Sequence, residues 1–101
     1  MIYTVRETPD YKCELDERVL SGGVMTFCHV EFFNYSPTVM RRFLSEWKTF
    51  RSTVPIPLFA QGPAEEDQKW RKFVALLGFK FIRAVPCNNG EWRSLYLHTA
   101  Q

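Results

Sequence analysis

Residues 70–79 read WRKFVALLGF, and this stretch decides the fold class. Its apolar side chains recur at intervals of three and four, as on one face of a helix: Trp70, Phe73, Val74 and Leu77. Gly78 follows, where a glycine commonly ends a helix because it adopts the left-handed conformation without strain. The acidic run Glu65-Glu66-Asp67 precedes the stretch, where the helix dipole favours negative charge. The stretch therefore predicts a helix that turns directly into a strand at Leu77-Gly78-Phe79.

Two strands are expected after this turn. Residues 80–85 and 92–98 are rich in apolar and aromatic side chains, and Asn89-Gly90 lies between them. This pair is the one that a type I′ hairpin turn prefers, because both central residues of that turn need a positive φ. The chain is therefore predicted to end in an antiparallel hairpin.

Upstream of the stretch, the sequence predicts a longer helix and a short strand. Ser36 offers an N-cap and Pro37 a first helical residue. A helical stripe then follows at Met40, Phe43, Leu44, Trp47 and Phe50. Prolines at positions 55 and 57 end that helix because each lacks a backbone donor, and residues 58–60 form the short strand.

Residues 24–35 read VMTFCHVEFFNY, which is typical of a central strand buried at least partly on both faces. Residues 1–23 are less regular. Ile2, Tyr3 and Val5 fit a short strand, and the spacing of four between Tyr11, Leu15 and Val19 fits a short helix ended by Gly22-Gly23. An extended hairpin arm is the alternative for this segment.

The sequence as a whole predicts one α/β (α+β) domain over residues 1–101, with a variable N-terminal segment at 1–23. From residue 24 to residue 98 the predicted order is β-α-β-α-β-β, a mixed sheet with two main helices. A chain of 101 residues has material for one modest core, and its 46% apolar content is far from that of disordered chains.

Composition also narrows the partners. The formal charge of +2 is well short of the basic excess of most nucleic-acid-binding domains, so nucleic acid is not the expected partner. The N-terminus lacks the basic and apolar segments of a signal peptide, and no apolar run is long enough to span a bilayer. We expect a protein that is neither secreted nor membrane-bound.

The spacing of the cysteine and histidine residues predicts neither a metal site nor a catalytic thiol. Cys13, Cys28 and Cys87 are widely spaced, without a Cys-x-x-Cys pair, so packing cysteines and no metal are expected. Cys28 and His29 are adjacent on a predicted strand, so their side chains point to opposite faces and cannot form a nucleophile–base pair. His98 is expected to be a surface or partly buried histidine without a partner.

The element order from residue 24, together with the helix exit at 70–79, resembles the C-terminal half of the GNAT family of acyl-CoA-dependent N-acetyltransferases. It is also similar to small GNAT-like proteins of tailed bacteriophages. The resemblance implies a reduced GNAT-like sheet, and a place in the host cytoplasm or the virion. It further implies acetyl-CoA as the cofactor of an active member, held by Ser36, Thr38, Val39 and Met40, with Glu31 as the strand carboxylate available as general base.

Two positions depart from the family pattern. The family's pyrophosphate loop, Gln/Arg-x-x-Gly-x-Gly/Ala, corresponds here to a stretch without glycine in which Pro37 lacks an N–H. The family's tyrosine four residues before the glycine of the Gly-Phe pair corresponds to Val74, which has no proton to give. We therefore expect a non-catalytic protein without a cofactor; an acetyl-CoA-dependent N-acetyltransferase acting on a protein or small amine is the alternative.

The two predicted helices carry basic faces opposite their apolar stripes. Solvated surface is the ordinary interpretation of such faces, and a docking patch for an acidic protein or phosphate-bearing ligand is the sharper one. The residues that we expect to bind a phage or host protein partner are Arg41, Arg42, Lys48, Arg51, Lys69, Arg71 and Lys72. A homo-oligomer is a further possibility.

Overall fold

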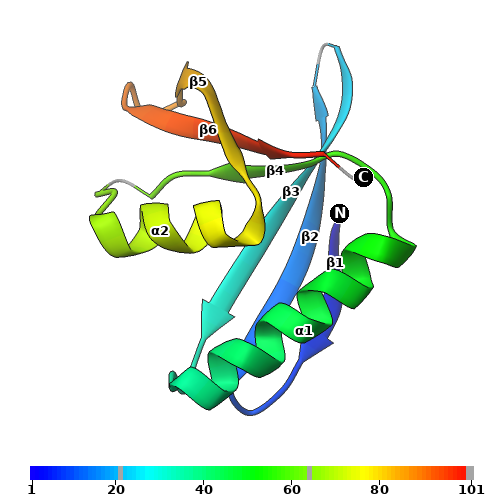
Figure 1. Cartoon of the computed structure of the whole chain (residues 1–101). Coiled ribbons are helices and arrows are strands. Elements are labelled where there is room, and N and C mark those ends of the chain that lie inside the picture. Colours follow the sequence, from blue (N-terminus) through cyan, green and yellow to red (C-terminus); the bar gives the residue numbers. More distant parts are fainter. Residues whose placement is uncertain (21, 64, 100–101) are drawn as a thin grey trace.

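The computed structural model describes residues 1–20, 22–63 and 65–99, and shows a six-stranded mixed sheet with two helices (Figure 1). The elements are β1 (Ile2–Glu7), β2 (Tyr11–Leu20), β3 (Gly23–Phe32), α1 (Pro37–Thr53), β4 (Leu58–Gln61), α2 (Gln68–Leu77), β5 (Lys80–Pro86) and β6 (Trp92–His98). The strand order is β1-β2-β3-β4-β6-β5. The α+β class and the order β-α-β-α-β-β predicted from residue 24 are confirmed.

The sheet consists of two antiparallel halves, β1-β2-β3 and β4-β6-β5, joined by one parallel pair. β3 and β4 share a single register position, Phe27 opposite Phe59. The two strands then diverge, as Figure 1 shows. α1 follows β3 and α2 follows β4, so each helix is carried by one half of the opened sheet.

Both helices begin and end as their sequences predict. The Ser36 side chain accepts a hydrogen bond from the Val39 N–H at 3.1 Å, and the Asp67 side chain accepts one from the Trp70 N–H at 2.8 Å. Gly78 ends α2 with φ of 98°. The N–H of Phe79 donates to the Val74 carbonyl at 3.0 Å, which closes the last turn.

The core lies between one face of the sheet and the two helices. Alternate residues of β2 point into it, and so do Leu58 and Ala60 of β4. An aromatic cluster joins the helices: the Phe43 and Phe73 rings lie 5.9 Å apart, and the Trp47 and Phe79 rings also lie 5.9 Å apart. These contacts fasten α1 and α2 to the same side of the sheet.

The N-terminal helix predicted over Tyr11, Leu15 and Val19 is wrong, and the hairpin alternative is right. β1 and β2 pair antiparallel, and β2 also pairs antiparallel with β3 along its whole length. A spacing of four fits a strand as well as a helix, because residues an even number apart share one face of a strand. Cys13, buried between Tyr11 and Leu15, shows that the period here is two.

The final hairpin is confirmed, but its type I′ turn is wrong. Gly90 has a positive φ of 83°, whereas no described residue other than glycine does, so Asn89 lacks the φ that type I′ needs. The Gly90 N–H donates to the Cys87 carbonyl at 3.0 Å, and the Cys87 N–H donates to the Glu91 carbonyl at 2.8 Å. Three residues therefore lie inside the hydrogen-bonded Cys87–Glu91 pair, and Gly90 is the last of them.

Candidate functional site

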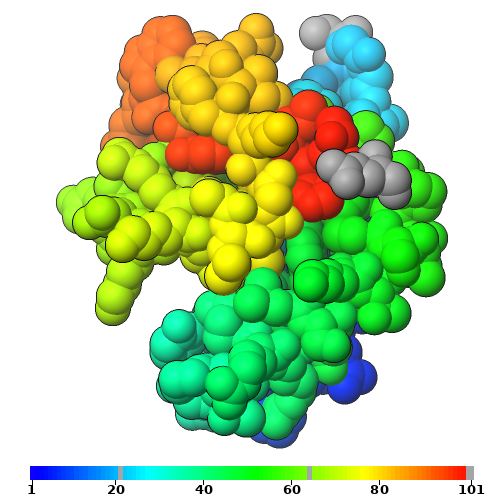
Figure 2. Space-filling model, in the orientation of Figure 1, coloured from blue at the N-terminus to red at the C-terminus, as the bar shows by residue number. Residues whose placement is uncertain are grey.

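A groove runs between the two helices on the face that they share. Two hollows of about 420 Å³ each lie along it. We call the first the Arg51 hollow; α1 supplies Leu44, Lys48 and Arg51 to its wall, and α2 supplies Leu76. The second, the Phe73 hollow, lies between Met40 of α1 and Lys69 and Phe73 of α2. In Figure 2 the surface recedes between the yellow α2 and the green α1, and we refer to the two hollows together as the interhelix groove.

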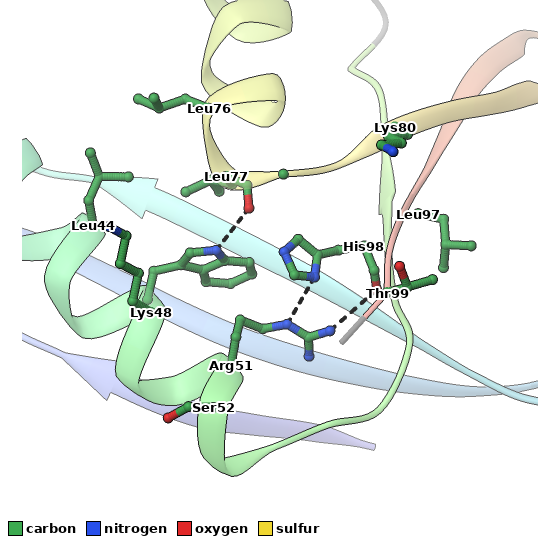
Figure 3. Close-up of a pocket in the computed structure, with 12 residues that line it drawn as sticks. Leu44, Lys48, Arg51, Ser52, Leu76, Leu77, Lys80, Leu97, His98 and Thr99 are labelled. Atoms are coloured by element: carbon green, nitrogen blue, oxygen red, sulfur yellow. Dashed lines mark hydrogen bonds between the residues drawn. The ribbon is translucent and has the colours of Figure 1, made fainter. Parts of the chain in front are cut away.

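Arg51 lies on the floor of the groove rather than on an exposed basic face, which corrects its predicted surface position. The residue as a whole is only 7% exposed. Its Nε–H donates to Nδ1 of His98 at 3.0 Å and Nη2 donates to the His98 carbonyl at 3.3 Å (Figure 3). Nη1 donates to the Val54 carbonyl at 2.9 Å. The guanidinium thus fastens the end of α1 to the end of β6.

His98 is partly buried, as expected, but it has a partner that the sequence did not reveal. Its ring meets the edge of Trp47 at a centroid distance of 5.5 Å and that of Phe79 at 5.3 Å. Burial and the neighbouring charge of Arg51 lower the pKa of His98, so the ring is neutral near pH 7. Since Nδ1 accepts from Arg51, the proton of the neutral ring is on Nε2.

The rim of the groove is basic. Lys48 lines the Arg51 hollow and Lys69 lines the Phe73 hollow; both are exposed, and no ion pair to them is found among the described residues. Arg41 and Lys72 are exposed on the same two helices but line neither hollow. Lys80, at the start of β5, adds a further cation to the Arg51 hollow. Neither hollow has an Asp or Glu among its described lining residues. Each of the two predicted basic faces therefore contributes one exposed lysine to the lining of the groove.

Two of the predicted partner-binding residues are already engaged. Arg42 forms an ion pair with Asp10 at 3.0 Å, and Arg71 forms one with Glu66 at 3.0 Å. Both arginines remain exposed. Arg42 turns toward the β1–β2 connection and away from the groove, since its partner Asp10 belongs to that connection.

The residues predicted to hold a cofactor, Ser36, Thr38, Val39 and Met40, lie together at the start of α1. The Val39 N–H donates to the Ser36 side chain, and the Met40 N–H donates to the Ser36 carbonyl at 2.9 Å. Pro37 has no N–H. Among the helical residues 37–40 of this turn, only Thr38 has an amide N–H without a protein acceptor, so the first turn of the helix offers an anion one donor instead of a cradle.

The side chain of the predicted catalytic residue Glu31 points away from the face of the sheet that carries the helices. Its neighbour Val30 packs against the core beneath the helices, so alternation along β3 directs Glu31 to the opposite face of the sheet, where it is exposed. The same alternation buries Cys28 and exposes His29, as predicted. Val74 is 5% exposed and packs in the core. The structure therefore does not bring Glu31 together with the Ser36 turn or the interhelix groove.

Searches of family models, of curated proteins and of solved structures each give no match to this chain. Neither described helix is long and apolar enough to cross a membrane. In the described part of the chain, no three His, Cys, Asp or Glu side chains are grouped so that they could hold a metal ion.

Proposed function

We propose that this chain is a non-catalytic protein-binding module of GNAT-like fold that binds an acidic segment of a partner protein in the interhelix groove. One observation carries the proposal: cations from α1, α2 and β5 line the groove, and no described acidic side chain lies among them. Apolar side chains such as Leu44 and Leu76 stand beside these cations. Complementary charge would steer an acidic segment into the groove, and the apolar walls would hold it.

The GNAT-like part of the proposal rests on the order of the elements. A long strand is followed by a helix, a parallel strand, a second helix and a closing hairpin, in agreement with the resemblance noted from the sequence. The non-catalytic part rests on the Ser36 turn, whose amides are largely used within the protein, and on buried Val74. A virion component or an inhibitor of a host protein is the biological setting that the resemblance suggests.

One observation favours the alternative, an acetyl-CoA-dependent N-acetyltransferase. The Phe73 hollow lies next to the start of α1 and is lined mainly by apolar and aromatic side chains, including Phe32 and Tyr35. Such a hollow could accept the apolar arm of an acyl carrier beside the one free amide of Thr38. Isothermal titration with acetyl-CoA tests this alternative, because saturable heat that Thr38→Glu abolishes would favour the enzyme.

Fluorescence anisotropy with a labelled glutamate peptide tests the proposed function. A peptide of about ten residues spans at most ~35 Å when extended. This length matches the longest dimension of the domain, 38 Å. The test variant is Lys48→Glu/Lys69→Glu on the groove, and the matched control is Lys12→Glu/Arg83→Glu on β2 and β5, which changes the net charge equally. All four positions are at least partly exposed, so both variants should fold.

We expect the groove variant to weaken peptide binding by at least about tenfold and the control by less than about threefold. Added salt should weaken binding to the unmodified protein, because the rim charges are exposed. Equal losses in both variants would show attraction to net charge alone and would contradict the groove as the binding site. A peptide that does not bind at all would contradict the proposed function.

A further inference from the structure

Arg51 is a buried cation whose described partners are all neutral. Its three hydrogen bonds go to an imidazole nitrogen and to two backbone carbonyls. No carboxylate of the described residues lies within ion-pair distance of it. Removing a guanidinium from water costs free energy that a paired anion normally offsets. Burial accordingly lowers the pKa of Arg51, although the group stays charged.

Some N–H groups of the guanidinium also make no hydrogen bond within the described chain. It carries five N–H groups, and the hydrogen bonds within the described chain use one on each of its three nitrogens. One N–H remains on each terminal nitrogen, and donation from two nitrogens to two oxygens is the two-pronged contact that guanidinium groups make with a carboxylate or a phosphate. Arg51 forms part of the wall of a hollow of about 420 Å³, so this positive charge faces space that an anion could fill.

The surroundings hold the guanidinium in place. His98 fixes Nε, and its ring is itself fixed between the rings of Trp47 and Phe79. Lys48 and Lys80 stand at the rim of the same hollow, and Figure 3 shows Lys48 on α1 beside Leu44, with Leu76 across the gap. A fixed arginine with two exposed lysines around it is a suitable receptor for one oxyanion.

We propose that the Arg51 hollow is a binding site for an oxyanion, which Arg51 holds through its two remaining N–H groups and which Lys48 and Lys80 help to neutralise. The inference rests on the proposed function for the identity of the natural ligand, which is then a carboxylate of the acidic segment. A phosphate group has the same chemistry, and the experiment distinguishes the two.

Two-dimensional proton–nitrogen NMR tests the site. Sodium phosphate and sodium acetate are titrated separately into the labelled full chain, with sodium chloride at matched ionic strength as the control. The reporters are the Nε–H of Arg51 and the indole N–H of Trp47, which donates to the Leu77 carbonyl at 3.0 Å beside the hollow. A chain with an amidated C-terminus is titrated as well, so that the terminal carboxylate does not compete.

We expect at least one oxyanion to move both reporters to a plateau that chloride does not reproduce. Lys48→Ala/Lys80→Ala should weaken that binding by about fivefold, and both lysines are exposed, so this variant should fold. Arg51→Lys, which keeps the charge but loses the two-pronged geometry, should weaken it further. Saturation by acetate identifies carboxylate as a ligand, and saturation by phosphate alone identifies phosphate; both support the site.

Reporters that do not move, or that move equally with chloride, would overturn the site, as would a Lys48→Ala/Lys80→Ala variant that binds both oxyanions unchanged. The outcome is separable from that of the proposed function. If an oxyanion binds at Arg51 but the glutamate peptide does not bind, the site stands and the acidic-partner proposal fails. If the peptide binds while neither oxyanion moves the reporters, the site fails and the acidic-partner proposal stands.

Discussion

Replacing Gly78 by alanine should destabilise the protein more than any local conformational cost explains. Gly78 has φ of 98°, where a residue with a Cβ is strained by about 1–2 kcal/mol. The new Cβ would also lie 3.0 Å from Nε2 of His98 and 3.1 Å from its Cδ2. That ring is held by Arg51 and two aromatic rings, so we expect a further cost of about 1–2 kcal/mol for overpacking.

Gly90→Ala separates these two costs. Gly90 also has a positive φ, of 83°, but nothing lies within 4 Å of the Cβ that an alanine would have there. The control should therefore lose only the conformational term, about 1–2 kcal/mol. Gly78→Ala should lose about 2–4 kcal/mol in total.

Urea denaturation followed by circular dichroism measures both variants. A difference of about 1 kcal/mol corresponds to ~4–8 °C in Tm for a chain of this size, so thermal unfolding gives a second reading. Introducing His98→Ala into both proteins should remove the excess cost at position 78. If Gly78→Ala and Gly90→Ala lower the free energy of unfolding equally, the His98 ring moves aside without cost. Because Arg51 is held through that ring, this result would refute our description of Arg51 as rigidly held.

Three further predictions use the same denaturation assay. Ser36→Ala removes the N-cap of α1 and should cost about 1 kcal/mol, whereas Ser45→Ala on the exposed face of that helix should cost less than about 0.5 kcal/mol; equal losses would contradict the cap. Val74→Tyr overpacks the core and should lower the free energy of unfolding by about 1–3 kcal/mol. A Val74→Tyr variant that is more stable than the unmodified protein and that transfers acetyl from acetyl-CoA would contradict the non-catalytic proposal. Because burial and the charge of Arg51 lower the pKa of His98 in the folded state, the unfolded chain binds the proton more tightly, and stability should fall as the pH drops below about 6.5. His98→Gln should reduce the change in urea midpoint between about pH 7.5 and about pH 5.5, and an unchanged difference would refute this role of His98.

The sequence predicts best those parts of the fold that depend on interactions between residues close together in the chain. Ser36 and Gly78 mark helix ends through hydrogen bonds to residues at most four positions away, and the apolar stripe of α2 repeats within ten residues. The N-terminal hairpin lacks such signals. Its apolar residues fit both periods, and pairing with β3 decided the outcome, which is a long-range effect.

The sequence allowed only part of the candidate site around Arg51 to be predicted. Arg51 continues the series Val39, Phe43 and Trp47 at intervals of four, so its position on the buried side of α1 was predictable from spacing. Its charge favoured a surface position instead, because arginine is seldom buried without a partner. That partner, His98, lies 47 residues away in the chain, and no local pattern connects the two.

The opening of the sheet and the opening between the helices have one cause. β3 and β4 pair at a single position and then diverge, and each is followed directly by one of the two helices. The helices are therefore carried apart, and long side chains such as Phe43, Trp47 and Phe73 bridge the space beneath them. Lys48 of α1 and Lys80 of β5 then stand at the rim of a hollow whose lining includes Arg51. The topology determines where the groove lies, and the rim residues determine its charge. Reversing the rim charges should therefore change what binds without changing the fold.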